Sequence, residues 1–401
     1  MQKDRLKYVI FAVYPLASLI YTAALFISGL REGICLTAVL LAAILSAVIM
    51  KYVRIEHTED VVFLVYIIYN LLSGIWCVYF GIPLMVYVGE VTTTLIPMGL
   101  FYAGRSMKDE DALRFYECFI LAVLFLGVLG VILNAVAPQF YLDYSVAMNY
   151  ISKADAETAR VRMDSVVGSG ALATLLCFSV CSSVFLIEDE HKSRRIRGIV
   201  YLVLSVVFAF MANQRASMAS IIIMLIFFNY TAFRVYKAAP VKYLIYEAAA
   251  LVLAIGGIVV FAGGIFDKIM ARLVSIPQGF GERSEQWIAA VNNMCNIWLG
   301  DGLGSHGHRA VGYQPYIVAD GGLVKIYAEM GLIGTSVIIF LLVLIYRKTY
   351  RNLKSVVPEI AIITCAILIS IGSNPLEFEI CAPIAYFALG RAVLKLTEDK
   401  G

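Results

Sequence analysis

Charged residues are scarce in this chain, and their scarcity excludes a typical soluble fold. Asp, Glu, Lys and Arg make up 15% of the 401 residues, whereas hydrophobic residues make up 61%. A typical soluble domain contains about 25% charged and about 45–50% apolar residues. The composition therefore indicates an integral membrane protein. The net charge of +3 identifies no partner, because membrane topology accounts for where the positive charge lies, and we expect no nucleic-acid partner.

Histidine is also scarce, which argues against a metal centre. The chain has four histidines, and two of them fall on the expected inner face of the membrane. The remaining ligand set would be His306 and His308 with Asp301 or Asp320, and two imidazoles with carboxylates make a weak site. We therefore expect neither a metal nor another cofactor.

Long apolar runs, in contrast, are abundant. A helix of about 20 residues crosses a bilayer, and the runs lack the alternating pattern of a membrane β-barrel. We therefore expect an all-α integral membrane protein with about twelve transmembrane helices, in a single polytopic domain over residues 1–401. All cysteines except Cys295 fall inside these runs, so no disulfide framework is implied. The expected spans lie near residues 8–30, 33–52, 61–80, 83–103, 115–137, 168–187, 197–212, 215–235, 242–264, 322–346, 357–373 and 378–397.

Basic residues set the expected orientation, because they accumulate on the cytoplasmic side of membrane helices. With the N-terminus inside, most Lys and Arg residues fall in the inner segments. We therefore expect both termini to be cytoplasmic. The first span follows the charged start MQKDRLK and has no small-residue cleavage site after it, so we expect a retained helix and not a signal peptide.

Two segments on the expected outer face are longer than the other connections. They are residues 138–167, and residues 265–321 between the ninth and tenth helices. Long loops in compact proteins are usually functional or disordered. In the larger loop, Trp287, Val291 and Trp298 recur at helical spacing with polar residues opposite them. This pattern predicts an interfacial helix over residues 284–298, which either packs as an ordinary loop element or also borders a lipid substrate.

Arginine is enriched in the expected outer segments, where basic residues are otherwise disfavoured. A guanidinium group grips phosphate with two parallel hydrogen bonds, although ordinary ion pairs with loop carboxylates are the alternative. Arg215 is the most informative case, because in NQRASMAS it lies between two apolar spans, where a charge requires a partner or a polar cavity. Glu90, inside the fourth span, is either its counter-ion or a site residue. The outer arginines are Arg31, Arg160, Arg162, Arg215, Arg272, Arg283 and Arg309.

The most polar part of the large loop reads GDGLGSHGHRA from Gly300. A dinucleotide-binding fingerprint is excluded, because Ser305 stands where a third glycine is required and no soluble βαβ unit surrounds it. The glycines favour instead a flexible loop that binds an anion through backbone N–H groups. Asp320 follows at the start of a membrane helix, either as its N-cap or as a carboxylate that accepts a proton from a hydroxyl group. Further along that helix, Lys325 and Glu329 have the spacing of an ion pair and would neutralise each other.

Four motifs occur in order between about residues 155 and 346. They are RVRMDSVVGSGALAT, NQRASMAS, Arg283 followed by Trp287 and LGDGLGS, and DGGLVKIYAEMGLIG with Glu329, Gly331 and Gly334 in an E-x-G-x-x-G arrangement. Together they resemble the O-antigen polymerase and O-antigen ligase superfamily of bacterial membrane glycosyltransferases. The ligase branch typically has a His-Asn pair at the start of the last helix, where this chain has Asp320 and Gly321. The resemblance therefore favours the polymerase branch.

The resemblance implies a metal-independent glycosyltransferase that polymerises undecaprenyl-diphosphate-linked oligosaccharide repeat units into surface polysaccharide, such as O-antigen, capsule or exopolysaccharide. It implies the bacterial cytoplasmic (inner) membrane, with the active site facing the periplasm or the cell exterior. The partners would be the lipid-linked glycan donor and acceptor, the lipid bilayer, and flippase and chain-length regulator proteins. The candidate general base is Asp320, with Glu329 and Asp301 in reserve. The candidate substrate-binding residues are Arg162, Arg215, Arg283, Arg160, Arg309, Tyr313 and Tyr316.

Two other functions remain open at this point. A ligase of the same superfamily would transfer finished polymer to a lipid A core or another acceptor. A lipid-linked oligosaccharide flippase would also have about twelve helices and buried arginines. Transporters are commonly built from two matching halves, however, and this chain shows no internal repeat.

Overall fold

The computed structural model describes residues 55–147, 163, 165–187, 191–234, 278–377 and 380–398. Every regular element in these residues is a helix, and seven segments are long and apolar enough to cross a membrane. The prediction of a helical membrane protein is therefore confirmed. The expected spans at 8–30, 33–52 and 242–264 lie outside the described residues. The expected spans at 357–373 and 378–397 appear as helices of 17 residues each, α17 (Leu353–Ile369) and α18 (Ala382–Glu398).

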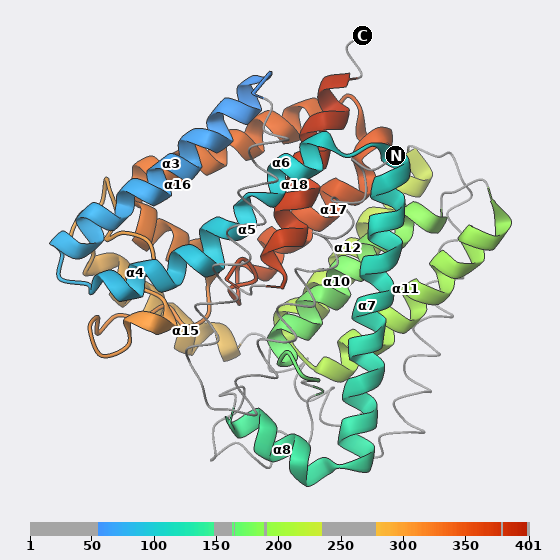
Figure 1. The fold of residues 1–401 in the computed structure, drawn as a ribbon, viewed down its shortest axis with the longest axis horizontal. Coiled ribbons are helices and arrows are strands. Elements are labelled where there is room, and N and C mark those ends of the chain that lie inside the picture. Colours follow the sequence, from blue (N-terminus) through green and yellow to red (C-terminus); the bar gives the residue numbers. More distant parts are fainter. Residues whose placement is uncertain are drawn as a thin grey trace, which may run out of the picture. The chain divides into compact units, whose positions relative to one another are not determined.

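The chain divides into two compact units, each described here by itself (Figure 1). The first unit contains Met1–Leu41, Lys108–Ile276 and Val357–Cys365. The second contains Ala42–Met107, Pro277–Val356 and Ala366–Gly401. The helices of the first unit are α7 (Asp109–Val136), α8 (Pro138–Ala147), α10 (Ser169–Ile187), α11 (Lys192–Ala212) and α12 (Arg215–Arg234).

Helix α10 forms the centre of the first unit. Its most apolar stretch is 83% buried, more than that of any other span in the described residues. Serine and glycine let its neighbours approach closely, because small residues favour helix contacts in membranes. Ser179 of α10 and Ser205 of α11 share a hydrogen bond of 2.7 Å, and Gly127 of α7 faces the ring of Phe208.

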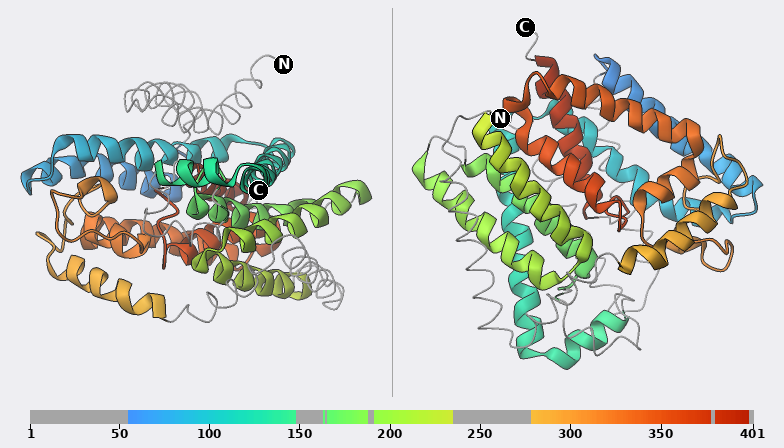
Figure 2. Two further views of the ribbon diagram at one scale, coloured as in Figure 1. Left: turned by 90° about the horizontal axis from the view of Figure 1, so that it is seen from below. Right: turned by 180° about the vertical axis from the view of Figure 1, so that it is seen from behind.

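The second unit contains the helices that carry the candidate site. They are α3 (Thr58–Tyr79), α4 (Leu84–Glu90), η1 (Val91–Leu95), α5 (Ile96–Met98), α6 (Leu100–Ser106), α15 (Gln278–Asn292), η3 (His308–Ala310), α16 (Gly322–Thr349) and α18. Helices α3 and α16 run side by side in all views (Figures 1 and 2). Residues Leu84–Ser106 form one continuous span, with a π-helical turn, η1, just before Pro97. Proline has no N–H to donate, and such a disruption is a common cause of a local change in helix winding.

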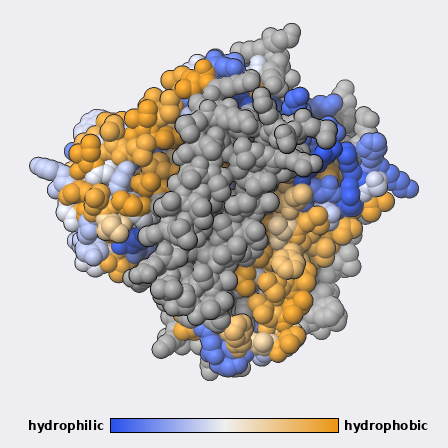
Figure 3. Space-filling model, in the orientation of Figure 1, coloured by the Kyte–Doolittle hydropathy of each residue, from blue (hydrophilic) through white to orange (hydrophobic). Residues whose placement is uncertain are grey.

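Helix α3 has two faces of different character. Phe63, Asn70 and Cys77 are buried at helical spacing, whereas Leu71, Ile75 and Tyr79 are exposed. The exposed apolar side of α3 is seen at the upper left of Figure 3. An exposed apolar stripe on a membrane helix is the face expected to meet lipid.

The predicted interfacial helix differs from the observed one. Helix α15 spans Gln278–Asn292 and thus begins and ends about a turn and a half earlier than 284–298. Beyond its end, Asn296 forms a turn, its side-chain oxygen accepting the N–H groups of Trp298 and Leu299 at 2.9 and 3.0 Å. In the other long loop, 138–167, the described part contains a helix, α8, that the sequence did not predict.

Candidate functional site

Helix α16 is broken inside its apolar run, and the large loop fills the break. Gly331 has φ 61° and ψ −166°, which no helix contains. The break frees backbone groups, which in a membrane helix must find other partners. The N–H groups of Leu332 and Ile333 donate to the carbonyls of Ile297 and Trp298 at 2.9 and 3.1 Å.

The same loop also donates hydrogen bonds to the helix. The N–H groups of Asp301 and Gly302 donate to the carbonyls of Ala328 and Glu329, at 3.0 and 2.9 Å. Tyr69 of α3 joins them, its hydroxyl lying 2.9 Å from the Leu299 carbonyl. The motifs LGDGLGS and E-M-G-L-I-G therefore form one structure, in which loop backbone pairs with the opened helix.

The loop glycines are required by these close approaches. Gly300, Gly302 and Gly304 all have positive φ, which glycine adopts without strain. A Cβ on Gly300 would overlap the backbone of Glu329, and a Cβ on Gly304 would lie 2.9 Å from the Glu90 side chain. The glycines that were predicted to cradle an anion thus pack against α3, α4 and α16.

A buried contact between the side chains of Asp301 and His306 stabilises the loop. Both side chains are buried, and His306 Nε2 lies 2.9 Å from Asp301 Oδ2. His306 Nδ1 lies 2.7 Å from the Tyr316 carbonyl, which can only accept, so this nitrogen carries a hydrogen. Burial lowers the pKa of His306, but hydrogen bonds to Asp301 and the Tyr316 carbonyl outweigh it and raise the pKa above its ordinary value. Both ring nitrogens thus face oxygen acceptors, an arrangement that favours the imidazolium form of His306.

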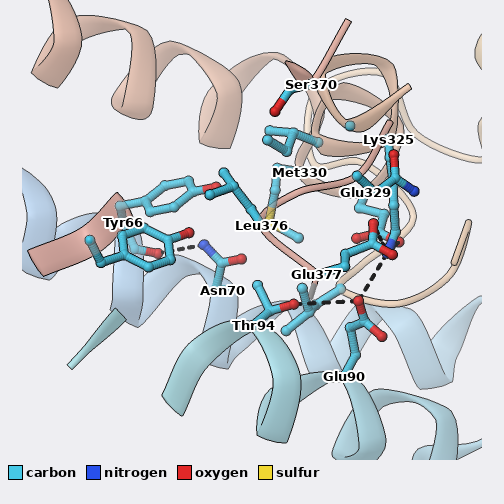
Figure 4. Close-up of a pocket in the computed structure, with 15 residues that line it drawn as sticks. Tyr66, Asn70, Glu90, Thr94, Lys325, Glu329, Met330, Ser370, Leu376 and Glu377 are labelled. Atoms are coloured by element: carbon cyan, nitrogen blue, oxygen red, sulfur yellow. Dashed lines mark hydrogen bonds and ion pairs between the residues drawn. The ribbon is translucent and has the colours of Figure 1, made fainter. Parts of the chain in front are cut away.

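Lys325 lies at the centre of the second unit's charged cluster. Its side chain is only 3% exposed, and its Nζ lies 2.9 Å from Glu90 Oε1, 3.5 Å from Glu329 Oε1 and 2.6 Å from Glu377 Oε1. Figure 4 shows these three carboxylates pointing toward the ammonium group. A lysine is seldom buried so completely unless it is paired. The predicted pairing of Lys325 with Glu329 is confirmed, as part of a larger network.

Arg309 completes this network from the loop. Its Nη1 donates to Glu90 Oε2 at 2.9 Å and to the Thr93 hydroxyl at 3.0 Å. The joined groups are two cations and three carboxylates, so the cluster has one negative charge too many when every group is ionised. Burial, opposed by Lys325 and assisted by Glu90, raises the pKa of Glu377. Such a shift favours a proton on a carboxylate of the cluster.

A cavity of about 40 Å³ lies against the carboxylates, with room for a few water molecules. Asn70, Thr94 and Ser370 give it polar walls, and Met330 and Leu376 give it apolar ones (Figure 4). The cavity therefore places solvent-sized space beside titratable groups, a combination typical of functional sites.

Beside this cavity, Arg283 and Asp320 form the more exposed part of the site. Arg283 Nη2 lies 2.8 Å from Asp320 Oδ2, and the two side chains are 32% and 42% exposed. Arg283 Nη1 also donates to the Gly372 carbonyl at 3.0 Å, which fixes the guanidinium fork. Trp287 fixes the backbone just before α16, because its Nε1 donates a hydrogen bond to the Asp320 carbonyl at 2.5 Å.

Asn374 connects the Arg283–Asp320 pair to the cavity that it lines. Its side-chain oxygen accepts the Gly321 N–H at 3.0 Å, and its amide nitrogen donates to the Ala319 carbonyl at 3.2 Å. Gly321 occupies the N-cap position of α16 without a side-chain cap. The N-cap alternative for Asp320 is therefore wrong, and its carboxylate pairs with Arg283 instead.

The predicted site residues fall into three groups. In the second unit, Asp320, Glu329, Asp301, Arg283 and Arg309 gather around the start and the break of α16. Of the two predicted tyrosines, Tyr313 is exposed and Tyr316 contributes its carbonyl to His306. Arg215 lies in the first unit, at the first position of α12. Arg160 and Arg162 lie outside the described residues.

Sequence reasoning missed Glu377 and Asn374. Both lie in SNPLEFE, a polar interruption between two apolar runs, and this interruption was the available signal. Glu90 was identified as a possible counter-ion of Arg215, but its ion pairs are with Lys325 and Arg309. Among the described residues, no group of three or more His, Cys, Asp or Glu side chains is arranged to hold a metal.

Comparison with known proteins identifies no relative from which the function of this site could be inferred. No protein-family model matches the chain, and no curated protein matches its sequence. The chain is thus described by what its structure supports, a helical protein with several helices able to span a membrane.

Proposed function

We propose that the protein is a glycosyltransferase that polymerises lipid-linked oligosaccharide repeat units at the outer leaflet of the bacterial cytoplasmic membrane. The observation that carries this proposal is the contact between Arg283 and Asp320, 2.8 Å apart and partly exposed. A fixed guanidinium group suits a diphosphate, and a carboxylate beside it suits an incoming hydroxyl group.

The proposed reaction uses both groups. The acceptor sugar's hydroxyl oxygen forms a bond to the anomeric carbon of the donor, and its proton passes to the Asp320 carboxylate. The bond from that carbon to the diphosphate oxygen breaks, and the diphosphate leaves with the electron pair. Arg283 stabilises the charge that develops on the leaving group, which is usually the largest catalytic contribution. When a diphosphate oxygen takes the place of Asp320 on Arg283, the carboxylate becomes a stronger base.

The proposal includes the topology that the sequence predicts. About twelve spans with both termini in the cytoplasm put the start of α16 and the loop before it on the outer face. The substrates there would be undecaprenyl-diphosphate-linked glycans, one as donor and one as acceptor. A flippase would supply them, and a chain-length regulator would limit the product.

The test is polymerisation by purified protein in detergent, supplied with its organism's undecaprenyl-diphosphate repeat unit with and without a chelator. We expect a ladder of longer lipid-linked glycans that survives chelation. R283A and D320N should each reduce the ladder at least a hundredfold, the scale of losing one electrostatic or acid–base group. R114A is the matched control, because Arg114 is exposed and pairs only weakly with Glu110 at 3.8 Å.

Other outcomes would assign other functions. Attachment of preformed polymer to a lipid A core, without any ladder, would identify a ligase. Movement of the lipid-linked unit across vesicle membranes without new glycosidic bonds would identify a flippase. A full ladder from both R283A and D320N would refute the assignment of these two residues.

A further inference from the structure

The turn between α11 and α12 in the first unit carries buried polar atoms of two side chains that have no hydrogen-bond partner among the described residues. Helix α11 ends at Ala212, and Asn213 follows in the left-handed conformation, with φ 52° and ψ 43°. Helix α12 then begins at Arg215 and runs for 20 residues. Asparagine tolerates a left-handed backbone better than most residues, which explains the residue type but not the state of its side chain.

The Asn213 side chain is fully buried, with an exposed fraction of 0%. Within the described residues, neither its amide nitrogen nor its amide oxygen has a hydrogen-bond partner, and the buried Nε of Arg215 also has none. A buried polar group without a hydrogen-bond partner destabilises the folded protein. Two such residues within one turn therefore indicate that a missing partner completes the site.

The surroundings of the turn favour an anion as that partner. Helix α12 has no acidic residue in its first turn, and Arg215 makes no ion pair within the described part of the chain. The N-terminal end of a helix presents free N–H groups and a partial positive charge. The side-chain oxygen of the intervening Gln214 accepts the Ser217 hydroxyl of α12 at 2.9 Å.

The turn is also held in place from another part of the first unit. The Met163 N–H donates to the Met211 carbonyl at 3.1 Å, and the Ser165 hydroxyl donates to the Leu126 carbonyl of α7 at 2.7 Å. Asn213 and Arg215 therefore stand on a packed support, so their unpaired groups can be pre-positioned for a ligand.

We propose that Asn213 is a further ligand-binding residue which, together with Arg215 and the N-terminal end of α12, binds the phosphate and first sugar of a lipid-linked glycan. Arg215 and the Asn213 amide N–H groups donate to phosphate oxygens. The Asn213 amide oxygen accepts from a sugar hydroxyl or acetamido N–H. The identity of this ligand rests on the proposed function, whereas the need for an anion with a neighbouring donor rests on the turn itself.

The test is lipid binding to the full-length protein in detergent, measured by native mass spectrometry. The probes are undecaprenyl diphosphate carrying one N-acetylated sugar, undecaprenyl diphosphate without a sugar, and phosphatidylglycerol. N213G keeps the left-handed backbone and removes the amide, whereas N213D keeps the shape and adds a negative charge. R234Q is the matched control for R215Q, because it removes the same charge from the opposite end of α12.

We expect N213G to weaken binding of the sugar-bearing lipid about tenfold, the size of one or two hydrogen bonds to a charged ligand. N213D should weaken it further by repulsion, R215Q should weaken both diphosphates, and R234Q should change neither. Because N213G also removes the contact to the sugar, it should affect the sugar-free diphosphate less.

Two results would overturn the inference. One is binding by folded N213G and N213D equal to that of the wild type. The other is equal competition by phosphatidylglycerol, which would mean that bulk lipid headgroups fill the turn. The polymerisation assay is read separately, so a missing ladder with intact Asn213-dependent binding would refute the proposed reaction and leave the binding site standing.

Discussion

Among the described residues, Lys325 makes the largest number of ion pairs, three. It is almost fully buried between Glu90, Glu329 and Glu377. A buried charge is tolerated because its partners compensate for lost hydration, and removing one partner leaves the others uncompensated. Because Lys325 forms ion pairs with three carboxylates, its loss should destabilise the folded protein more than the loss of any one of these carboxylates.

We therefore predict that K325M destabilises the protein by roughly 3–5 kcal/mol, the cost of breaking a buried ion pair. E377Q is the informative control, because it removes the surplus negative charge of the cluster and should leave stability unchanged or raised at neutral pH. The measurement is thermal unfolding of the detergent-purified protein, followed by intrinsic fluorescence. Equal midpoints for K325M and the wild type would contradict this account of the cluster.

His306 supports a second prediction, which concerns pH. Its pKa is raised above 6.5 in the folded protein, so its contribution to stability is complete below about pH 6.5 and is lost as the pH rises through the folded value. The difference in unfolding midpoint between the wild type and H306Q should therefore be largest in acid and should shrink in alkali. A scan of unfolding midpoints from about pH 5 to pH 9 measures it. A difference that grows with pH would mean that His306 is neutral.

At the scale of elements, the break in α16 is the feature on which the site depends. It separates residues 322–330, which follow Asp320, from the rest of a 28-residue helix, and its free backbone groups bind residues 297–302 of the loop. Loop and helix therefore behave as one element, although a short residue pattern suggested a loop followed by an uninterrupted span. Non-helical backbone at this depth is tolerated where it is buried in protein.

G331A should be severely destabilising, by more than about 2 kcal/mol. Gly331 has φ 61° and ψ −166°, a backbone conformation essentially restricted to glycine that costs another residue about 1–3 kcal/mol, and the new Cβ would overlap the Gly300 and Trp298 backbone. G281A in α15 is the control, since its Cβ would meet nothing within 4 Å and alanine favours helix by about 1 kcal/mol. Detergent-solubilised yield and unfolding midpoint measure both variants. A G331A protein as stable as G281A would show that the break is not fixed by this glycine.

At the scale of the whole molecule, orientation in the membrane is the property on which the function turns. An outer active site requires the loop that contains Cys295 to face away from the cytoplasm. Among the described cysteines, Cys77, Cys177, Cys181, Cys365 and Cys381 are buried, whereas Cys118 and Cys295 are exposed. Cys118 lies inside the apolar helix α7, so a water-soluble reagent should react with Cys295 in the loop. The chain therefore has its own chemical reporter of sidedness.

We predict that a membrane-impermeant maleimide labels Cys295 in intact spheroplasts, and that C295S abolishes this labelling. Burial and the Asp301 carboxylate raise the pKa of the Cys295 thiol, so labelling should be faster near pH 9 than near pH 7, because the thiolate is the reactive form. Labelling of Cys295 only after the membrane is permeabilised would reverse the proposed topology.

The sequence predicted the membrane class, most of the described spans and the pairing of Lys325 with Glu329, because hydropathy and helical spacing are local signals. It did not predict that Glu90 and Lys325, 235 residues apart, form an ion pair, since tertiary contacts decide such pairs. It also did not predict that Arg309, a candidate substrate-binding residue, forms an ion pair with Glu90. The glycines of the loop were interpreted as an anion cradle, because a sequence does not distinguish close approach to a ligand from close approach to a helix.

The pairing of the loop with the broken helix also affects how the protein is made. Synthesis runs from the N-terminus, and earlier segments fold first, so Tyr69 and residues 297–302 leave the ribosome before Gly331 does. When the break in α16 enters the bilayer, the backbone groups that satisfy it already exist. Deleting residues 297–302 would therefore leave the backbone groups at the break of α16 without partners during membrane insertion. We expect cellular quality control to degrade such a protein before any loss of activity is observed.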